Sequence, residues 1–289
     1  MIKIKIEEAA EILNAPCIGT CHWDKLIEGV SIDSRNVKEN NLFVPIKGMT
    51  VNGHSFVQDA IKKGAIASLW NKDEPNPPED IALILVEDTV KALQDLSRYY
   101  RNKLNVKIVG VTGSNGKTST KDITAAILSQ KYKTQKTLGN YNTEIGVPFT
   151  LLSLDDDCQA AVIEMGMERK GDIEFLTDLV QPDIAIITSV GLVHIDNFAS
   201  IEEIAGAKLE IAKGIKDGGL LIYYGDDPLI QETVRNTRIK ESIRRQTFGL
   251  NRNNTLWLKD FRQDLKGITI KVSDESLDEL HIDILGKHQ

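Results

Sequence analysis

The sequence predicts an α/β protein in which a small N-terminal α/β domain is followed by a larger domain with a mostly parallel central sheet and appended antiparallel strands. Three observations favour this fold. Strand-like and helix-like patterns alternate regularly between residues 90 and 235, which is typical of parallel strands joined by crossover helices. A glycine-rich loop joins one of these strands to the helix that follows it. After Gln246 the pattern changes to short alternating runs, which indicate antiparallel strands.

The composition is that of an ordinary globular protein, and it excludes some classes of partner. Of the 289 residues, 41% are hydrophobic and 27% are charged, which allows two domains that each bury a core. The formal net charge of -7 argues against a nucleic-acid partner, since such a surface needs an excess of Lys and Arg. The longest apolar run, at residues 184–187, has the length of a strand, so no membrane span is expected.

The cysteines favour a cytoplasmic protein. The three cysteines, Cys17, Cys21 and Cys158, cannot all pair with one another, and the N-terminus has no signal-peptide core. Cys17, Cys21 and His22 lie close enough in sequence to suggest a metal site. No second pair of ligands follows them, so unpaired thiols are favoured over a zinc site.

The first domain, residues 1–86, is expected to alternate short elements and to end near Val86. The apolar face of its first helix consists of Ile6, Ala9, Ala10 and Leu13. Three apolar runs of strand length follow, at residues 42–46, 65–69 and 81–86. A helix at residues 56–63 ends at Gly64, a typical C-cap. The three prolines of residues 71–80 predict a surface loop that lies within this domain.

The second domain, residues 87–289, is expected to carry the parallel sheet. Its predicted helices are at residues 90–104, 118–130, 173–180, 201–213 and 228–235. The predicted strands are at residues 107–112, 133–137, 160–164, 184–188 and 220–223. Three further strands, expected to be antiparallel, are at residues 255–258, 267–272 and 280–285. Helices between successive strands predict a sheet that is covered on both faces.

The strongest local signal is the glycine loop, which has the context of a P-loop. In residues 109–118, VGVTGSNGKT, an apolar strand runs into the loop and then into a helix, an order that argues against a chance glycine-rich turn. The glycines allow successive N–H groups to face one anion, and the helix N-terminus adds its positive end. The general pattern has a glycine where Val111 stands, so the first loop glycine here is Gly113. The predicted nucleotide-binding residues are Thr112, Gly113, Ser114, Asn115, Gly116, Lys117 and Thr118.

This shortened loop resembles that of the Mur ligase family, which builds the peptide of bacterial cell-wall precursors. Similar segments are found at residues 140–148, 164–167 and 207–211, and the resemblance covers essentially the whole chain. It implies an ATP-dependent ligase that adds D-alanyl-D-alanine to UDP-N-acetylmuramoyl-tripeptide. In the family, ATP phosphorylates a carboxylate, and an amine attacks the acyl phosphate to form the amide. Two anions must approach each other, so metal ions and cations have to be in place.

The resemblance also implies the residues that act on ATP and the metal. Lys117 would reach the terminal phosphates, and Thr118 would hold Mg²⁺ together with Glu164, which ends an apolar strand. His194 would bind a second metal, whereas in isolation it would be a capping or core histidine. Lys208 would be carbamylated by CO₂, which requires a neutral, partly desolvated amine. Its alternative is a solvated helix lysine.

Other matching residues imply the substrate contacts. Asn142 and Thr143 match positions that bind the muramoyl-peptide substrate, although alone they would be turn residues. Residues 31–35 and 48–54 resemble the segments that hold the UDP group, where Ser34 and Arg35 can donate to uracil or diphosphate oxygens. The family has an acidic residue where Asn52 stands, so a contact of that carboxylate is not expected here.

The last residues of the chain resemble the start of a segment that contacts adenine and leads into a third domain. His288 is the predicted adenine contact, and the third domain is expected to be absent from this chain. Three alternatives stay open: a related ligase that adds lysine or diaminopimelate, a nucleotide-binding module without ligase activity, and a generic P-loop kinase. The kinase ranks last because it would not explain residues 31–54. A monomer is expected.

Overall fold

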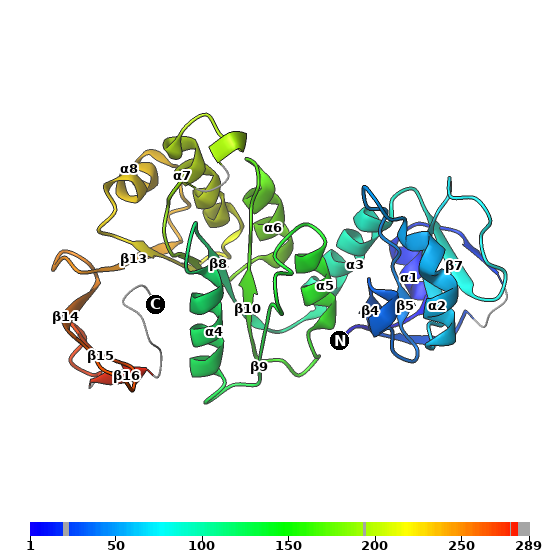
Figure 1. Cartoon of the computed structure of the whole chain (residues 1–289), viewed down its shortest axis with the longest axis horizontal. Helices are drawn as coiled ribbons and strands as arrows, with labels where there is room; N and C mark the ends of the chain where they lie inside the picture. The colour runs from blue at the N-terminus through cyan, green and yellow to red at the C-terminus, as the bar shows by residue number, and fades with distance from the viewer. Residues whose placement is uncertain (20–22, 193–194, 278, 283–289) are drawn as a thin grey trace. The chain divides into compact units, whose positions relative to one another are not determined.

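The computed structural model describes residues 1–19, 23–192, 195–277 and 279–282, which form two compact units. The first unit comprises Met1–Val106 and Thr137–Gln159, and the second comprises Lys107–Lys136 and Ala160–Gln289 (Figure 1). The chain therefore leaves the second unit, contributes one segment to the first unit, and returns. This division differs from the boundary near Val86, because the helix α3 and the later segment both pack in the first unit.

The first unit contains a five-stranded sheet and a separate two-stranded sheet. The larger sheet has the order β2-β7-β6-β5-β4, in which only β2 is antiparallel to its neighbour, and β1 pairs with β3. The strands are β1 (Lys3–Lys5), β2 (Cys17–Ile18), β3 (Leu26–Glu28), β4 (Val30–Ser31), β5 (Leu42–Phe43), β6 (Ala67–Asn71) and β7 (Ala82–Val86). The helices are α1 (Ile6–Ile12), α2 (Val57–Lys62), α3 (Thr89–Lys103) and α5 (Gly146–Ser153), with 3₁₀ turns η1 (Ser34–Asn36) and η2 (Gly53–Phe56).

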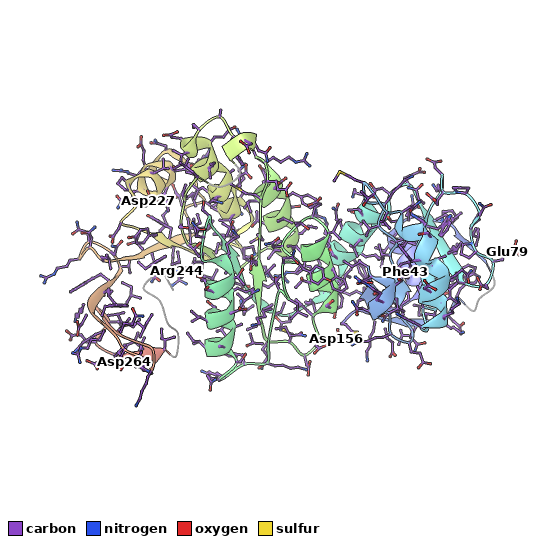
Figure 2. All side chains as sticks on the ribbon, in the orientation of Figure 1. Phe43, Glu79, Asp156, Asp227, Arg244 and Asp264 are labelled. Atoms are coloured by element: carbon purple, nitrogen blue, oxygen red, sulfur yellow. The ribbon has the colours of Figure 1, made fainter. Side chains whose placement is uncertain are left out.

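Apolar side chains on both faces of this larger sheet form the core of the first unit. Leu42 and Ile84 pack with residues of α1 and α3 in one cluster. Phe43 and Leu83, their neighbours in sequence, pack with residues of α2 in another cluster, and Phe43 is labelled in Figure 2. Successive strand residues point to opposite faces, so this alternation shows that helices cover both faces.

The helix α5 was not predicted from the sequence, and neither were the short strands β1, β2, β3 and β4. Its residue Leu152 belongs to the core with α1 and α3, and the Leu152 carbonyl accepts a hydrogen bond of 2.8 Å from the Ile2 amide. A Cβ at Gly146, where α5 begins, would lie 2.4 Å from the Tyr141 Cα. Glycine at this position therefore allows the preceding turn to fold against the helix.

The second unit contains a nine-stranded sheet of order β16-β15-β14-β13-β12-β11-β8-β10-β9. Its strands are β8 (Lys107–Thr112), β9 (Thr134–Lys136), β10 (Ala160–Glu164), β11 (Ile184–Ile187), β12 (Leu220–Tyr224), β13 (Arg244–Gly249), β14 (Leu256–Gln263), β15 (Ile268–Val272) and β16 (Leu280–Ile282). Its helices are α4 (Lys117–Leu128), α6 (Asp172–Val180), α7 (Ile201–Leu209) and α8 (Pro228–Asn236), with 3₁₀ turns η3 (Ile195–Asn197) and η4 (Glu210–Gly214).

The strand directions confirm the predicted fold class. The strands from β9 to β14 in the sheet order are parallel, whereas β15 runs antiparallel to its two neighbours, β14 and β16. The strand β13 was not predicted, and the predicted helix 201–213 divides into α7 and η4. Within the described residues, no helix combines the length and the apolarity needed to span a membrane.

The order of the strands determines where a ligand can bind. The strand β8 pairs with β10 on one side and with β11 on the other, so the sheet changes its direction of winding there. Val109, Val111 and Val162 of β8 and β10 pack against Ala125 of α4, which lies beside these strands in Figure 1. In open parallel sheets ligands bind at the carboxyl ends of the strands at such a switch point.

Candidate nucleotide and metal site

The glycine loop follows β8 at the switch point, and its backbone takes a shape that requires glycine. Gly113 has a φ of 151° and Gly116 has a φ of 80°. A Cβ at Gly113 would lie 1.9 Å from the Thr188 Oγ1. Gly116 is the N-cap of α4 and has no side chain to cap the helix, so amides of the first turn can face an anion.

The segment after β11 holds the loop in this shape. The Ser114 amide donates to the Ser189 carbonyl oxygen at 2.9 Å, and the Asn115 amide donates to the Ser189 Oγ at 3.0 Å. The Thr188 hydroxyl donates to the Asn115 carbonyl oxygen at 2.6 Å, and the Gly191 amide donates to the Ser114 Oγ at 2.8 Å. This support was not predicted from the sequence, because the pairing of β11 with β8 is what brings the two segments together.

Lys117, the first residue of α4, turns back onto the loop. Its Nζ donates to the carbonyl oxygens of Gly113 at 2.7 Å and Ser114 at 3.3 Å. Burial lowers the pKa of Lys117, although Glu164 acts in the opposite direction. The amine is therefore held among loop oxygens at the place where a phosphate-binding loop needs a cation.

Thr118 and Glu164 lie in direct contact. Glu164 is only 2% exposed, and its Oε2 accepts a hydrogen bond of 3.1 Å from the Thr118 Oγ1. Lys121, one turn further along α4, places its Nζ 3.5 Å from the same carboxylate oxygen. A hydroxyl and a carboxylate are the oxygen ligands that Mg²⁺ prefers, so the donor set suits this ion.

A buried hydroxyl at the start of the loop has no partner. In the part of the chain that the structure describes, Thr112 Oγ1 is the buried side-chain polar atom without a hydrogen bond. Leaving such a group unsatisfied costs about 1–3 kcal/mol. Together with the glycine shape, the first turn of α4 and the amine of Lys117, this hydroxyl fits a site for a bound phosphate chain.

Lys208 lies on α7 and is only 2% exposed. Burial is the main cause that lowers its pKa to about 8, and the charge of Lys117 contributes to this decrease. The carboxylate of Glu210 accepts hydrogen bonds from the amides of Gly171 and Glu174, which holds η4, and with it the end of α7, against the start of α6. Lys208 is thus a buried lysine close to Lys117 on a fixed element.

The lowered pKa of Lys208 predicts a dependence of stability on pH. Its folded pKa of about 8 lies below the ordinary value of 10.5, so between these values the unfolded chain binds more protons than the folded chain. The free energy of unfolding is expected to rise with pH over this range, by about 3 kcal/mol from this group. Denaturant unfolding in CO₂-free buffer would compare the wild type with Lys208→Met. A difference between them that stays constant with pH would contradict this expectation.

The first unit holds the other predicted site residues. The exposed Arg35 is already paired, since its Nε donates to the Asp33 Oδ1 at 2.9 Å and its terminal nitrogen donates to Oδ2 at 2.8 Å. The hydrogen bonds with this carboxylate are the main cause that raises the pKa of Arg35. The electrostatic effect of Tyr141 acts in the same direction, which indicates that Tyr141 lies near the segment of Ser34 and Arg35. Residues 142 and 143 follow Tyr141 directly, in the turn before α5.

Asn52 has a role inside the first unit. Its Oδ1 accepts hydrogen bonds from the His54 amide and from the His54 Nδ1, and its Nδ2 donates to the Glu74 Oε1 at 2.7 Å. The His54 Nε2 accepts a hydrogen bond of 3.3 Å from the Asn71 amide. This bond fixes the neutral tautomer of His54 that carries its proton on Nδ1. Burial lowers the pKa of His54. An amide at position 52 suits this arrangement because it can donate and accept at once.

Several predicted residues lie outside the described part of the chain: Cys21, His22, His194 and His288. Among the residues that the structure does describe, no group of three or more His, Cys, Asp or Glu side chains is placed to hold a metal ion.

Two known protein domains together match most of the length of this chain. The Mur ligase middle domain matches residues 111–289, and the catalytic domain of the Mur ligase family matches residues 26–101. The chain belongs to the Mur ligase family. This confirms the resemblance found in the sequence and excludes the generic kinase. The P-loop, Glu164 and Lys208 all lie within the Mur ligase middle domain.

Curated Mur ligases with high similarity share one name. The chain is 42% identical over 290 residues to UDP-N-acetylmuramoyl-tripeptide–D-alanyl-D-alanine ligase of Bacillus subtilis, an alignment that covers 100% of this chain and 61% of that protein. The Escherichia coli ligase of the same name is 36% identical over 229 residues, which cover 78% of this chain and 49% of that protein. The chain thus spans less than two thirds of the length of these relatives.

Solved structures with a similar fold point to the same group of ligases. MurF from Acinetobacter baumannii matches with a TM-score of 0.84 and 26% identity, over 100% of this chain and 62% of that one. MurF from Thermotoga maritima in complex with ADP matches with a TM-score of 0.75 and 32% identity, over 88% of this chain and 58% of that one. The fold and family of this chain therefore rest on both sequence and structure.

Proposed function

We propose that this chain is the nucleotide- and precursor-binding part of an ATP-dependent ligase that adds D-alanyl-D-alanine to UDP-N-acetylmuramoyl-tripeptide. The observation that carries the proposal is the contact of Thr118 with the buried Glu164 at the carboxyl ends of β8 and β10, beside Lys117, whose charge also acts on the buried Lys208 of α7. The 42% identity with the Bacillus subtilis ligase over the whole chain supports the choice of substrates.

In the proposed reaction the glycine loop binds the phosphates of ATP. The amides at the start of α4 face the phosphate oxygens, and the Thr112 hydroxyl supplies a further donor. Lys117 exchanges the carbonyl oxygens of Gly113 and Ser114 for phosphate oxygens, which form stronger, charge-assisted hydrogen bonds. The chain thereby places a positive charge where negative charge accumulates during phosphoryl transfer.

Thr118 and Glu164 would hold Mg²⁺ through the hydroxyl and the carboxylate that already touch. When bound, the metal would reduce the repulsion between the substrate carboxylate and ATP. The predicted second ligand His194 and the predicted adenine contact His288 remain part of the proposal. The cytoplasmic location, expected from the cysteines and the N-terminal sequence, and the monomeric state also remain predictions.

Lys208 would act as a carbamate. A neutral amine is the form that reacts with CO₂, and a pKa of about 8 leaves part of the side chain neutral near physiological pH. The Nζ lone pair forms the N–C bond, one C=O pair moves to oxygen, and the nitrogen releases a proton. The product turns a buried cation beside Lys117 into an anion, which removes the repulsion between the two lysines.

The first unit would hold the UDP-linked precursor. Arg35 presents a guanidinium that Asp33 keeps in a fixed orientation, which suits paired diphosphate oxygens. Ser34 would add a hydroxyl donor, and Asn142 and Thr143 would bind the muramoyl-peptide. Since the chain spans only 61% of the length of the Bacillus subtilis ligase, we expect this chain alone to bind both nucleotides and to ligate poorly.

The test is a product assay with the protein expressed together with whatever follows Gln289 in its gene. ATP, Mg²⁺, UDP-muramoyl-tripeptide and D-alanyl-D-alanine should yield phosphate and the pentapeptide product. Phosphate release only with the dipeptide precursor and lysine or diaminopimelate would favour the related ligase instead. Nucleotide binding without any product would favour the binding module.

The proposed carbamate on Lys208 leads to a separate prediction, which the same product assay can test. Lys208→Ala is expected to lose most activity, because the negative group at the metal site is gone. Added bicarbonate should not restore the activity, whereas short carboxylic acids should restore part of it by occupying the space of the missing carbamate. Full activity of Lys208→Ala without any additive would show that the carbamate assignment is wrong.

A further inference from the structure

Lys121 is a buried cation that the proposed reaction does not use. It lies on α4 and is 2% exposed. Its Nζ is 3.5 Å from the Glu164 Oε2 and 3.6 Å from the Asp122 Oδ1. Asp122 is partly exposed and also pairs with Lys136 at 2.9 Å. Of the two lysines that pair with Asp122, Lys121 is the one whose amine also lies within ion-pair distance of the buried Glu164.

Helix geometry directs Lys121 and Thr118 to the same atom. The two residues are three positions apart on α4 and therefore share one face of the helix. The Thr118 Oγ1 donates to the Glu164 Oε2, which is also the oxygen nearest the Lys121 amine. A cation and a hydroxyl thus hold one carboxylate oxygen from the helix that follows the phosphate loop.

We propose that Lys121 is a positioning residue that holds Glu164 in its binding orientation before Mg²⁺ arrives and that competes with Mg²⁺ for the Glu164 Oε2. This inference rests on the proposed role of Glu164 as a metal ligand. An isolated carboxylate would be costly in this buried position, so a cation has to neutralise it while no metal is bound. The same cation repels Mg²⁺, because two positive charges then approach one oxygen.

The first test compares Lys121→Met with the matched control Lys136→Met, which removes the other lysine that pairs with Asp122. The affinity for ADP would be measured over a series of Mg²⁺ concentrations. Lys121→Met is expected to lower, by about tenfold, the Mg²⁺ concentration that gives half of the full effect of Mg²⁺ on ADP affinity, because a charge that repels Mg²⁺ is gone. Lys136→Met should leave this concentration unchanged. An unchanged or higher Mg²⁺ requirement in Lys121→Met would overturn the competition.

Thermal unfolding without Mg²⁺ tests the positioning role. Lys121→Met removes the cation that lies 3.5 Å from the buried Glu164 carboxylate, so the Tm of the variant is expected to fall by about 10 °C. Lys121→Met combined with Glu164→Gln removes both charges and should recover most of this loss. Lys121→Arg keeps the charge and should stay close to the wild type. Equal losses in the single and double variants would show that Lys121 acts through packing alone.

Should Lys121→Met fail to fold, the wild-type chain still provides a measurement. NMR of lysine side chains labelled with ¹³C at Cε would follow the Lys121 signal, assigned with Lys121→Arg, during Mg²⁺ titration at saturating ADP. The Lys121 signal should shift with the midpoint of Mg²⁺ binding, and the Lys136 signal should not. A stationary Lys121 signal despite Mg²⁺ binding contradicts this inference alone, whereas a wild type that ignores Mg²⁺ and ADP contradicts the proposed function.

Discussion

Gly113→Ala is expected to abolish binding of Mg-ADP, raising its Kd by at least about 100-fold, and to lower the free energy of unfolding by about 3 kcal/mol. The φ of 151° is strained for alanine, and the new Cβ would lie 1.9 Å from the Thr188 Oγ1. Either the loop or Thr188 has to move, which breaks the hydrogen bond from Thr188 to the Asn115 carbonyl oxygen. Calorimetric titration and denaturant unfolding would measure both effects.

Gly206→Ala is the matched control for this change. Gly206 lies on α7, and a Cβ there would meet no atom within 4 Å. Alanine in an open helical position should leave Mg-ADP binding unchanged and stabilise the protein by about 0.5–1 kcal/mol. If Gly113→Ala bound Mg-ADP as well as Gly206→Ala does, the shape of the loop would not be the basis of nucleotide binding.

Lys117→Met is expected to weaken Mg-ADP binding by about 100-fold while the fold persists, because the phosphates lose a charge-assisted hydrogen bond. In the free protein the lysine donates hydrogen bonds to the Gly113 and Ser114 carbonyl oxygens. The variant should also raise the pKa of Lys208, which the charge of Lys117 now lowers. Calorimetry measures the affinity, and NMR titration of the Lys208 side chain measures the pKa.

The exposed Lys131 supplies the control, since Lys131→Met removes the same charge from the second unit away from the loop. It should change neither the affinity for Mg-ADP nor the pKa of Lys208. An affinity of Lys117→Met equal to that of Lys131→Met would contradict the role of Lys117 as the phosphate cation.

The local pattern of the sequence was sufficient to predict the loop and its flanking elements. The apolar strand, the glycines and the Gly-Lys-Thr run all follow one another in the chain, so their structure does not depend on distant contacts. Glu164 could be placed for a similar reason, because it ends an apolar run and parallel strands end at one edge of the sheet.

Features that depend on the register of distant strands could not be predicted. The support of the loop by Thr188 and Ser189 requires β11 to lie beside β8, and the contact of Lys121 with Glu164 requires α4 to pack on β10. The burial of Lys208 was inferred from the family resemblance and has no signal of its own in the sequence.

Among the elements that were missed, the strand β13 and the helix α5 lack the usual periodicity in their sequences. The strand β13 consists of Arg-Arg-Gln-Thr-Phe-Gly, whose polar start gives no strand pattern, although its register with β12 extends over five residue pairs. The helix α5 contains Pro148 and is apolar on most sides, which hides the helical period. Its place in the first unit depends on long-range packing of Leu152.

Calorimetric titration of Mg-ADP into the wild-type chain tests the nucleotide site most directly. One binding site is predicted, with an affinity that falls in Lys117→Met and in Gly113→Ala and persists in Gly206→Ala. Absence of binding heat at several temperatures, together with no Mg-ADP-dependent rise in Tm, would contradict the account of this loop as the phosphate site of a ligase.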